Sequence, residues 1–171
     1  MNHTIAILGG GNLGTALAKG LLASKQFEMK DIIITDKRGH RLNYLKGKGF
    51  TVSDNNAHAI RHADIVVMSI KPQQFNDLVE EIKNYITDKH IIISTITGIT
   101  LREIENSLGK LPIFRVMPNT ALAICESMTC IASKNCNAEQ EKRITSMFDK
   151  MGKTLKISED MMSAATVVGA C

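Results

Sequence analysis

Thr4-Ile-Ala-Ile-Leu-Gly-Gly-Gly-Asn-Leu-Gly14 is the stretch that decides the fold. A short apolar run leads into Gly9, Gly11 and Gly14 at G-x-G-x-x-G spacing. In a strand-turn-helix unit of this kind, the first glycine permits a tight turn and the second lets the backbone approach a pyrophosphate. The third lets the helix pack closely on the strand. The stretch therefore predicts a phosphate-binding turn between a strand and a helix.

The residues around the glycines support that prediction, because the glycine pattern alone also occurs in ordinary turns. Small and apolar residues follow it at helical spacing: Leu13, Ala16, Leu17, Gly20 and Leu21. Such a stripe is typical of a helix that packs on a sheet.

Apolar runs rich in Ile and Val alternate with helical patterns along most of the chain, as expected for parallel strands covered on both faces. Strands are predicted at 32–35, 63–70, 90–95 and 112–117, and helices at 72–86 and 100–108. Segments 127–132 and 153–157 alternate polar and apolar residues, which predicts edge or antiparallel strands around a helix near 144–151. The fold class is α/β: a Rossmann-type, doubly wound, mainly parallel sheet with helices on both faces and antiparallel edge strands near the C-terminus.

Composition fits a globular protein of one main domain, with 171 residues, 44% apolar and 22% charged. The first strand begins within four residues of Met1 and no apolar stretch reaches membrane-spanning length, so we predict a cytoplasmic protein without a membrane partner. The chain turns helical and rich in small residues after Ser158, and stops at Cys171 in the middle of that pattern. We expect an NAD(P)-binding domain at 1–157 and the start of a second, truncated domain at 158–171.

Metal binding is not predicted. The cysteines form no C-x-x-C pair and are interpreted as reduced thiols; they are Cys125, Cys130, Cys136 and Cys171. His58 and His62 are four residues apart in a predicted helix, but no third ligand is apparent, so an exposed helix face is favoured.

The net charge of +4 is unevenly placed, because residues 37–53 contain five Lys or Arg and no carboxylate. Such a patch could attract phosphate or, less readily, nucleic acid. Lys46 and Lys48 are interpreted as part of a solvated helix face, and no nucleic-acid partner is predicted.

The end of the second strand holds opposing signals for the cofactor. Asp36 lies 22 residues after Gly14, where an acid accepts hydrogen bonds from the ribose hydroxyls of NAD. Lys37 and Arg38 follow at once, and cations there favour the 2′-phosphate of NADP. The cofactor is therefore predicted as NADP or NAD; the alternative for Asp36 is a helix N-cap.

Three further loops fall at the carboxyl ends of strands, where open parallel sheets bind ligands. Together with the glycine-rich loop they resemble the pyrroline-5-carboxylate reductase family over essentially the whole chain. The matching blocks are Gly-Gly-Gly-Asn-Leu-Gly at 9–14, Ser-Ile-Lys-Pro at 69–72, Ile-Ser-Thr-Ile-Thr-Gly-Ile-Thr at 93–100 and Arg-x-Met-Pro-Asn-Thr at 115–120. The chain is also similar in outline to 6-phosphogluconate-type reductases.

The resemblance implies hydride transfer from NAD(P)H to the C=N carbon of 1-pyrroline-5-carboxylate, the last step of proline biosynthesis. By matching positions it implies cofactor contacts at Leu8, Gly9, Gly10, Gly11, Asn12, Leu13, Gly14, Asp36, Lys37, Asn56, Ser69, Ile70, Lys71, Pro72, Thr95, Ile96 and Thr97. It places Met117 and Asn119 near the nicotinamide and the substrate.

No catalytic residue is assigned, because a cyclic imine accepts hydride readily and catalysis can rest on orienting two bound molecules. Lys71 is interpreted as placing charge and starting a helix rather than as a proton donor. The resemblance further implies an all-helical second domain that begins just after 167–169, binds the substrate carboxylate and forms a homodimer or larger assembly. We therefore expect the chain alone to fold and bind dinucleotide with little or no reductase activity.

Two alternatives remain open. The chain could belong to a reductase for another substrate, such as a β-hydroxyacid or a deazaflavin-linked enzyme, that shares only the first domain. It could also be a non-enzymatic NAD(H)-binding module that senses redox state through a partner.

Overall fold

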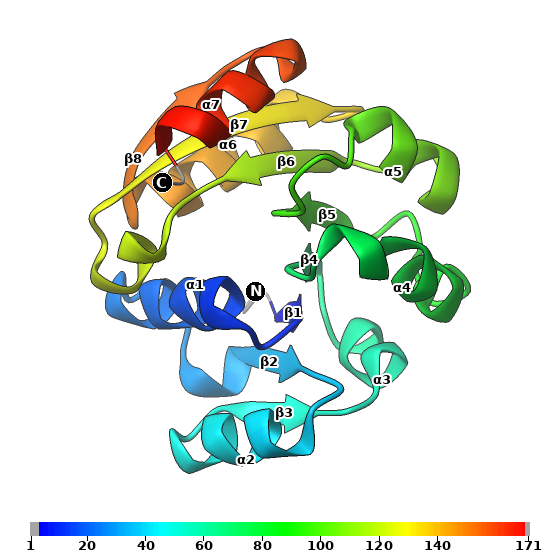
Figure 1. Cartoon of the computed structure of the whole chain (residues 1–171), viewed down its shortest axis with the longest axis vertical. Coiled ribbons are helices and arrows are strands. Elements are labelled where there is room, and N and C mark those ends of the chain that lie inside the picture. The colour runs from blue at the N-terminus through cyan, green and yellow to red at the C-terminus, as the bar shows by residue number, and fades with distance from the viewer. Residues whose placement is uncertain (1–3, 170–171) are drawn as a thin grey trace.

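The structure is a computed structural model that describes residues 4–169, and the side chains of residues 4–166. Eight strands form one sheet in the order β3-β2-β1-β4-β5-β6-β7-β8 (Figure 1). The strands are β1 (Ile5–Leu8), β2 (Ile32–Thr35), β3 (Thr51–Ser53), β4 (Ile65–Met68), β5 (Ile91–Ser94), β6 (Ile113–Met117), β7 (Ser127–Lys134) and β8 (Gly152–Lys156). The helices are α1 (Asn12–Ala23), α2 (Gly39–Gly47), α3 (Asn56–Arg61), α4 (Phe75–Ile82), α5 (Leu101–Leu108), α6 (Ala138–Asp149) and α7 (Met162–Gly169).

Strand direction confirms the predicted fold class. Strands β1 to β6 are parallel, β7 is antiparallel to β6, and β8 is parallel to β7. The last two strands therefore run opposite to the other six, and the order of the first six is that of a Rossmann sheet. The sheet edges are β3 and β8, so β7 is an interior strand; its alternating pattern predicted an edge or antiparallel strand, and the antiparallel alternative is confirmed.

Most bounds shift by a few residues, α6 begins at Ala138 rather than near 144, and two differences concern whole elements. Strand β3 was not predicted, because it has only three residues and none of them is fully buried, so no apolar run marks it. The predicted helix at 72–86 is divided into a 3-10 turn at Pro72–Gln74 and helix α4, which ends at Ile82. Cys171 and the side chains of the predicted small-residue segment from Val167 onward lie outside the described residues.

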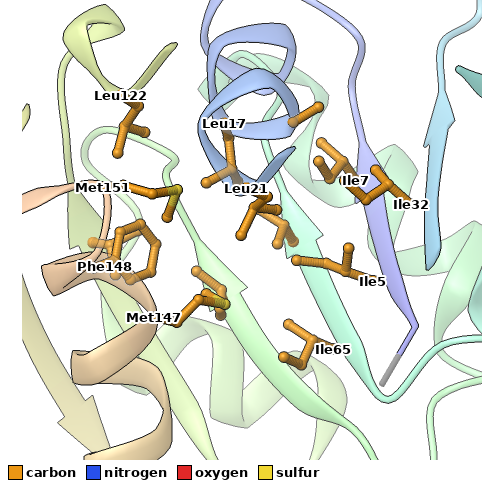
Figure 2. Close-up of a cluster of buried hydrophobic side chains, with 14 of the residues drawn as sticks. Ile5, Ile7, Leu17, Leu21, Ile32, Ile65, Leu122, Met147, Phe148 and Met151 are labelled. Atoms are coloured by element: carbon orange, nitrogen blue, oxygen red, sulfur yellow. The ribbon is translucent and has the colours of Figure 1, made fainter. Parts of the chain in front are cut away.

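Two apolar cores cover the two faces of the sheet, because successive strand residues point to opposite sides. Helices α1, α2 and α6 pack on the face that contains Ile5 and Ile7, whereas α3, α4, α5 and α7 pack on the face of Ala6 and Leu8. Figure 2 shows Leu17 and Leu21 of α1 between the strand side chains and the group formed by Met147, Phe148, Met151 and Leu122. This packing on both faces positions the strands whose carboxyl ends lead into the cleft loops.

Among residues 4–169, no helix is long and apolar enough to cross a bilayer.

Candidate functional site

A cleft of about 1010 Å³ lies at the carboxyl ends of the central strands, between the loops that follow β1, β2, β4 and β5. This volume is at the upper end of the usual range for small-molecule sites, about 300–1,000 Å³, and suits an extended ligand. The cleft wall contains every predicted cofactor residue except Gly10, Gly14 and Ile96. The glycine-rich loop and the loops at 69–72 and 95–97 therefore meet at one place, whereas the loop at 115–120 does not line the cleft.

The glycines of the first loop fill three different geometric roles. Gly9 has a φ of +112°, and a Cβ built on it would lie 2.2 Å from the Ser69 carbonyl oxygen. A Cβ on Gly14 would lie 2.1 Å from the Gly9 carbonyl oxygen, so α1 can approach the turn after β1 this closely because residue 14 has no side chain. Gly11 instead has extended backbone, with φ −65°, and apart from its own neighbours in the chain no atom of the described residues lies within 4 Å of the position of a Cβ. The space beside Gly11 is open to the cleft.

The N-terminus of α1 faces this open space and suits an anion. Gly11 is the N-cap residue, no side chain caps the helix, and the first turn has no acidic residue. The first backbone N–H groups of a helix lack partners within the helix, and the helix dipole adds positive potential at the same end. These features fit the pyrophosphate of a dinucleotide without any side-chain ligand.

Arg41 of α2 holds the other side of the glycine-rich loop. Its Nε donates to the carbonyl oxygen of Gly10, and its Nη2 donates to the carbonyl oxygen of Gly11 at 3.2 Å and to Oγ1 of Thr15 at 2.8 Å. The guanidinium also lies 5.0 Å from the centre of the Tyr44 ring. Arg41 therefore fixes the orientation of two loop peptides and adds a positive charge to the cleft.

Asp36 and Arg38 form an ion pair where β2 ends. Burial alone would raise the pKa of the Asp36 carboxyl, but the hydrogen bonds and the charge of Arg38, with a backbone contact from Gly10, hold it below the usual value. The carboxylate therefore stays ionised at neutral pH. Asp36 does not cap α2 with its side chain; Arg38 occupies the N-cap position of that helix.

Two other contacts shape the end of the cleft near β2. Nζ of Lys37 lies 2.7 Å from Oε2 of Glu81 on α4, so the two walls are joined by an ion pair. Oγ1 of Thr35 donates to Oδ1 of Asn56, and both side chains are buried at the cleft wall. Asn56 is thus held in place by a side chain of β2.

The loops after β4 and β5 are tied to the sheet by backbone hydrogen bonds. The Ser69 N–H donates to the Leu8 carbonyl oxygen at 2.8 Å, and the Thr95 N–H donates to the Met68 carbonyl oxygen at 3.0 Å. Thr95 and Thr97 line the cleft, whereas the side chain of Ile96, which lies between them in the chain, is fully buried in the core. The Ile96 side chain therefore anchors this loop in the apolar core and does not face the cleft.

The two residues predicted near the substrate lie apart from the cleft wall. Met117 ends β6 with its side chain in the core, 6% exposed. Oδ1 of Asn119 accepts a hydrogen bond from the Ala121 N–H at 3.0 Å and so caps the turn at Thr120–Ile124. In the structure, Met117 packs in the core, and Asn119 caps a 3-10 turn.

Several cleft residues were not among the predicted site residues. They come from the end of β2, from α2 and its N-cap, and from the segment 74–81, and comprise Thr35, Arg38, His40, Arg41, Tyr44, Gln74, Asp77, Leu78 and Glu81. The cationic patch at 37–53 was a usable signal for the group from α2 and its N-cap, but it does not show which side chains turn toward the glycine-rich loop. Among the described residues, no group of three or more His, Cys, Asp or Glu is placed to hold a metal ion.

The segment that forms this cleft matches a known protein family. The family model described as NADP oxidoreductase, coenzyme F420-dependent, matches residues 4–98, which is more than half of the chain. The chain belongs to this NADP oxidoreductase family. The matched range includes β1 to β5 and the loops that form the cleft.

Relatives that match almost the whole chain have a more specific name. Pyrroline-5-carboxylate reductase 1 of Dictyostelium discoideum is 38% identical over 99% of this chain and 33% of its own length. Pyrroline-5-carboxylate reductase 2 of the same organism is 37% identical over 99% of this chain and 62% of its own length. The chain thus spans less than two thirds of the length of either relative.

Solved structures agree with the sequence relatives. The pyrroline-5-carboxylate reductase of Coxiella burnetii superposes with a TM-score of 0.90 at 27% identity, covering 99% of this chain and 64% of that one. The Plasmodium falciparum pyrroline carboxylate reductase, solved with NADP bound, gives a TM-score of 0.86 at 26% identity, covering 98% of this chain and 62% of that one. A prephenate dehydrogenase of Aquifex aeolicus, at 15% identity, shares the fold.

Proposed function

We propose that this NADP oxidoreductase chain is the cofactor-binding part of a pyrroline-5-carboxylate reductase. The reaction moves a hydride from NADPH to the imine carbon of 1-pyrroline-5-carboxylate, while the ring nitrogen receives a proton, and it yields proline and NADP⁺. The observation that supports this best is the 38% identity to a pyrroline-5-carboxylate reductase over 99% of the chain. The names of these relatives favour the imine over a β-hydroxyacid or a deazaflavin substrate.

The geometry of the cleft supports NADP(H) as the cofactor. The open space beside Gly11 and the uncapped start of α1 provide backbone donors for a pyrophosphate. Arg38, Arg41 and Asn56 line the part of the cleft next to β2, where the adenosine half would lie. The loops at Ser69 and Thr95 then face the nicotinamide half.

The chain contributes mainly binding and orientation to this reaction. Its cleft loops are tied by backbone hydrogen bonds, so the cofactor would be held in one position while the imine approaches. NADPH supplies the hydride when it is bound. Lys71 is exposed at the start of a 3-10 turn, where its role is to add charge beside the loop rather than to donate the proton.

Residues 158–171 are proposed as the beginning of a second, helical domain, which would bind the substrate carboxylate and form the contacts between subunits of a homodimer or larger assembly. This division is supported by the resemblance of the chain to the reductases and by the share of their length that it spans. A cytoplasmic location, with no nucleic-acid or membrane partner, fits a small-molecule enzyme of proline biosynthesis.

The test compares the 171-residue chain with a form extended to the length of its relatives. NADPH oxidation is followed at 340 nm with 1-pyrroline-5-carboxylate, and proline is measured directly. We expect both forms to bind NADPH, the extended form to produce one proline per NADPH consumed, and the shorter chain to show little turnover. Binding without proline formation by the extended form would reject the reductase assignment, and robust turnover by the shorter chain would reject the division of roles.

A further inference from the structure

The part of the cleft next to β2 holds an acid that normally indicates NAD and cations that normally indicate NADP. In the structure, both oxygens of the Asp36 carboxylate already accept hydrogen bonds from Arg38. Its Oδ1 accepts hydrogen bonds from the backbone N–H and Nε of Arg38, at 3.0 and 2.9 Å, and its Oδ2 accepts from Nη2 of Arg38 at 2.9 Å. The Asp36 side chain is only 7% exposed.

This occupation limits what Asp36 can offer a ribose. A carboxylate has about four lone-pair positions, and Arg38 takes three of them. Accepting bonds from the hydroxyls of NAD requires a free, accessible carboxylate edge. Asp36 therefore does not present the acceptor pair that its place in the sequence suggests, as long as the guanidinium of Arg38 stays in position.

The guanidinium of Arg38 has donors left after it binds Asp36. The pair uses Nε and one hydrogen of Nη2, which leaves three of the five side-chain N–H groups, including both on Nη1. The Arg38 side chain is 55% exposed and lines the cleft. A planar guanidinium held at one edge can bind phosphate through the remaining edge.

The surrounding charges favour an extra phosphate. Asp36 is balanced by Arg38, and Lys37 is balanced by Glu81 on α4. Arg41 has only carbonyl, hydroxyl and ring partners among the bonds that hold it, so its charge is not neutralised by a carboxylate. The region next to β2 is therefore net positive, which suits the 2′-phosphate of NADPH more than the neutral hydroxyl of NADH.

We propose that Arg38 sets the cofactor preference of this cleft through two effects: it sequesters Asp36 from the ribose, and it offers its free guanidinium edge to the 2′-phosphate. The cleft then selects NADPH over NADH although Asp36 is present. This inference rests on the proposed function, which identifies the ligand of the cleft as a nicotinamide dinucleotide. It makes Arg38 a specificity-determining residue.

The test measures NADPH and NADH affinities of the 171-residue chain by fluorescence titration, without substrate. Arg38→Ala is expected to weaken NADPH binding about tenfold to a hundredfold, the loss of one or two charge-assisted hydrogen bonds, and to strengthen NADH binding because Asp36 is released. The double variant Asp36→Asn with Arg38→Ala is expected to lose as much NADPH affinity as Arg38→Ala alone, but not to gain NADH affinity. Lys46→Ala is the matched control, since it removes an exposed cation of the neighbouring helix α2 that lies outside the cleft wall, and it is expected to keep the ratio of NADPH to NADH affinity within about twofold.

Thermal unfolding of each variant shows whether α2 is intact, because Arg38 is its N-cap residue. An Arg38→Ala variant that unfolds like the wild type but binds both dinucleotides with an unchanged ratio would overturn the inference, and so would a gain in NADH affinity that persists in the double variant. Failure of proline formation with a normal NADPH preference would reject the proposed reaction and leave the role of Arg38 standing. A wild-type chain that binds neither dinucleotide would reject both.

Discussion

Gly11→Ala is expected to weaken dinucleotide binding by roughly tenfold to a hundredfold, corresponding to one or two charge-assisted hydrogen bonds, while leaving the fold unchanged. The backbone at Gly11 is extended, with φ −65°, so alanine fits without strain. Its methyl group would enter open space, with no atom of the described residues beyond its chain neighbours within 4 Å, on the side where the proposed site places the pyrophosphate. Equilibrium titration with NADPH and thermal unfolding of the same sample provide the two readouts.

Gly9→Ala is the matched contrast to Gly11→Ala. Its Cβ would lie 2.2 Å from the Ser69 carbonyl oxygen, and its φ of +112° is strained for any residue with a side chain. This variant should therefore lose stability as well as binding. If Gly11→Ala binds NADPH like the wild type, the pyrophosphate does not approach the loop at this point.

Glu159→Ala is expected to lower the free energy of unfolding by about 3 kcal/mol, the lower end of the range for removing one partner of a buried ion pair. Oε1 of Glu159 accepts from Nη1 of Arg115 at 3.1 Å and from the Leu101 N–H at 2.6 Å. The Arg115 side chain is 6% exposed, and its Nε is buried without a hydrogen-bond partner. Loss of Glu159 would leave that cation without its hydrogen-bonded carboxylate, and Glu103, whose pKa the charge of Arg115 helps to lower, would be the remaining acid near it. Urea unfolding monitored by circular dichroism measures the change.

Arg115→Met distinguishes this ion pair from simple packing. The Glu159 side chain is 30% exposed, so after the loss of Arg115 it can still reach water and the Leu101 N–H. The loss of stability should therefore be roughly half that of Glu159→Ala or less, because methionine fills much of the space with an apolar chain. A larger loss for Arg115→Met than for Glu159→Ala would contradict the explanation from an uncompensated buried charge.

The ion pair between Arg115 and Glu159 also joins segments that are far apart in the sequence. Arg115 lies in β6, Leu101 begins α5 directly after the loop at Thr95–Thr100, and Glu159 precedes α7. The predicted strand at 112–117 includes Arg115, and the block at 115–120 also counts it with the loop that follows, but neither pattern indicates an ion pair. The partner of Arg115 lies 44 residues later in the chain, and only the tertiary packing brings the two side chains together.

The central sheet was predictable because its strands are nearly continuous runs of Ile and Val, and burial on both faces requires that composition. Strand β3 was not, since its three residues owe their conformation to pairing with β2 rather than to their own pattern. The antiparallel direction of β7 and β8 was indicated by alternation, but the interior position of β7 depends on β8 pairing beside it.

The site was predictable to the level of loops and not of side chains. Parallel strands bring the loops at 9–14, 69–72 and 95–97 to one edge, so their meeting follows from the fold alone. The contact of Arg41 with the Gly10 carbonyl oxygen depends on how α2 packs against α1, and the pairing of Asp36 with Arg38 depends on side-chain rotamers. Periodicity contains neither kind of information.

The most direct test of the central claim is a map of amide chemical-shift changes when NADP⁺ is added to the ¹⁵N-labelled 171-residue chain, whose mass is 18.8 kDa. The dinucleotide cleft predicts saturable changes at residues 9–14, 36–41, 69–72 and 95–97, with β8 and α6 unaffected. Changes confined to other surfaces, or none at millimolar NADP⁺, would contradict the assignment of this cleft as the cofactor site.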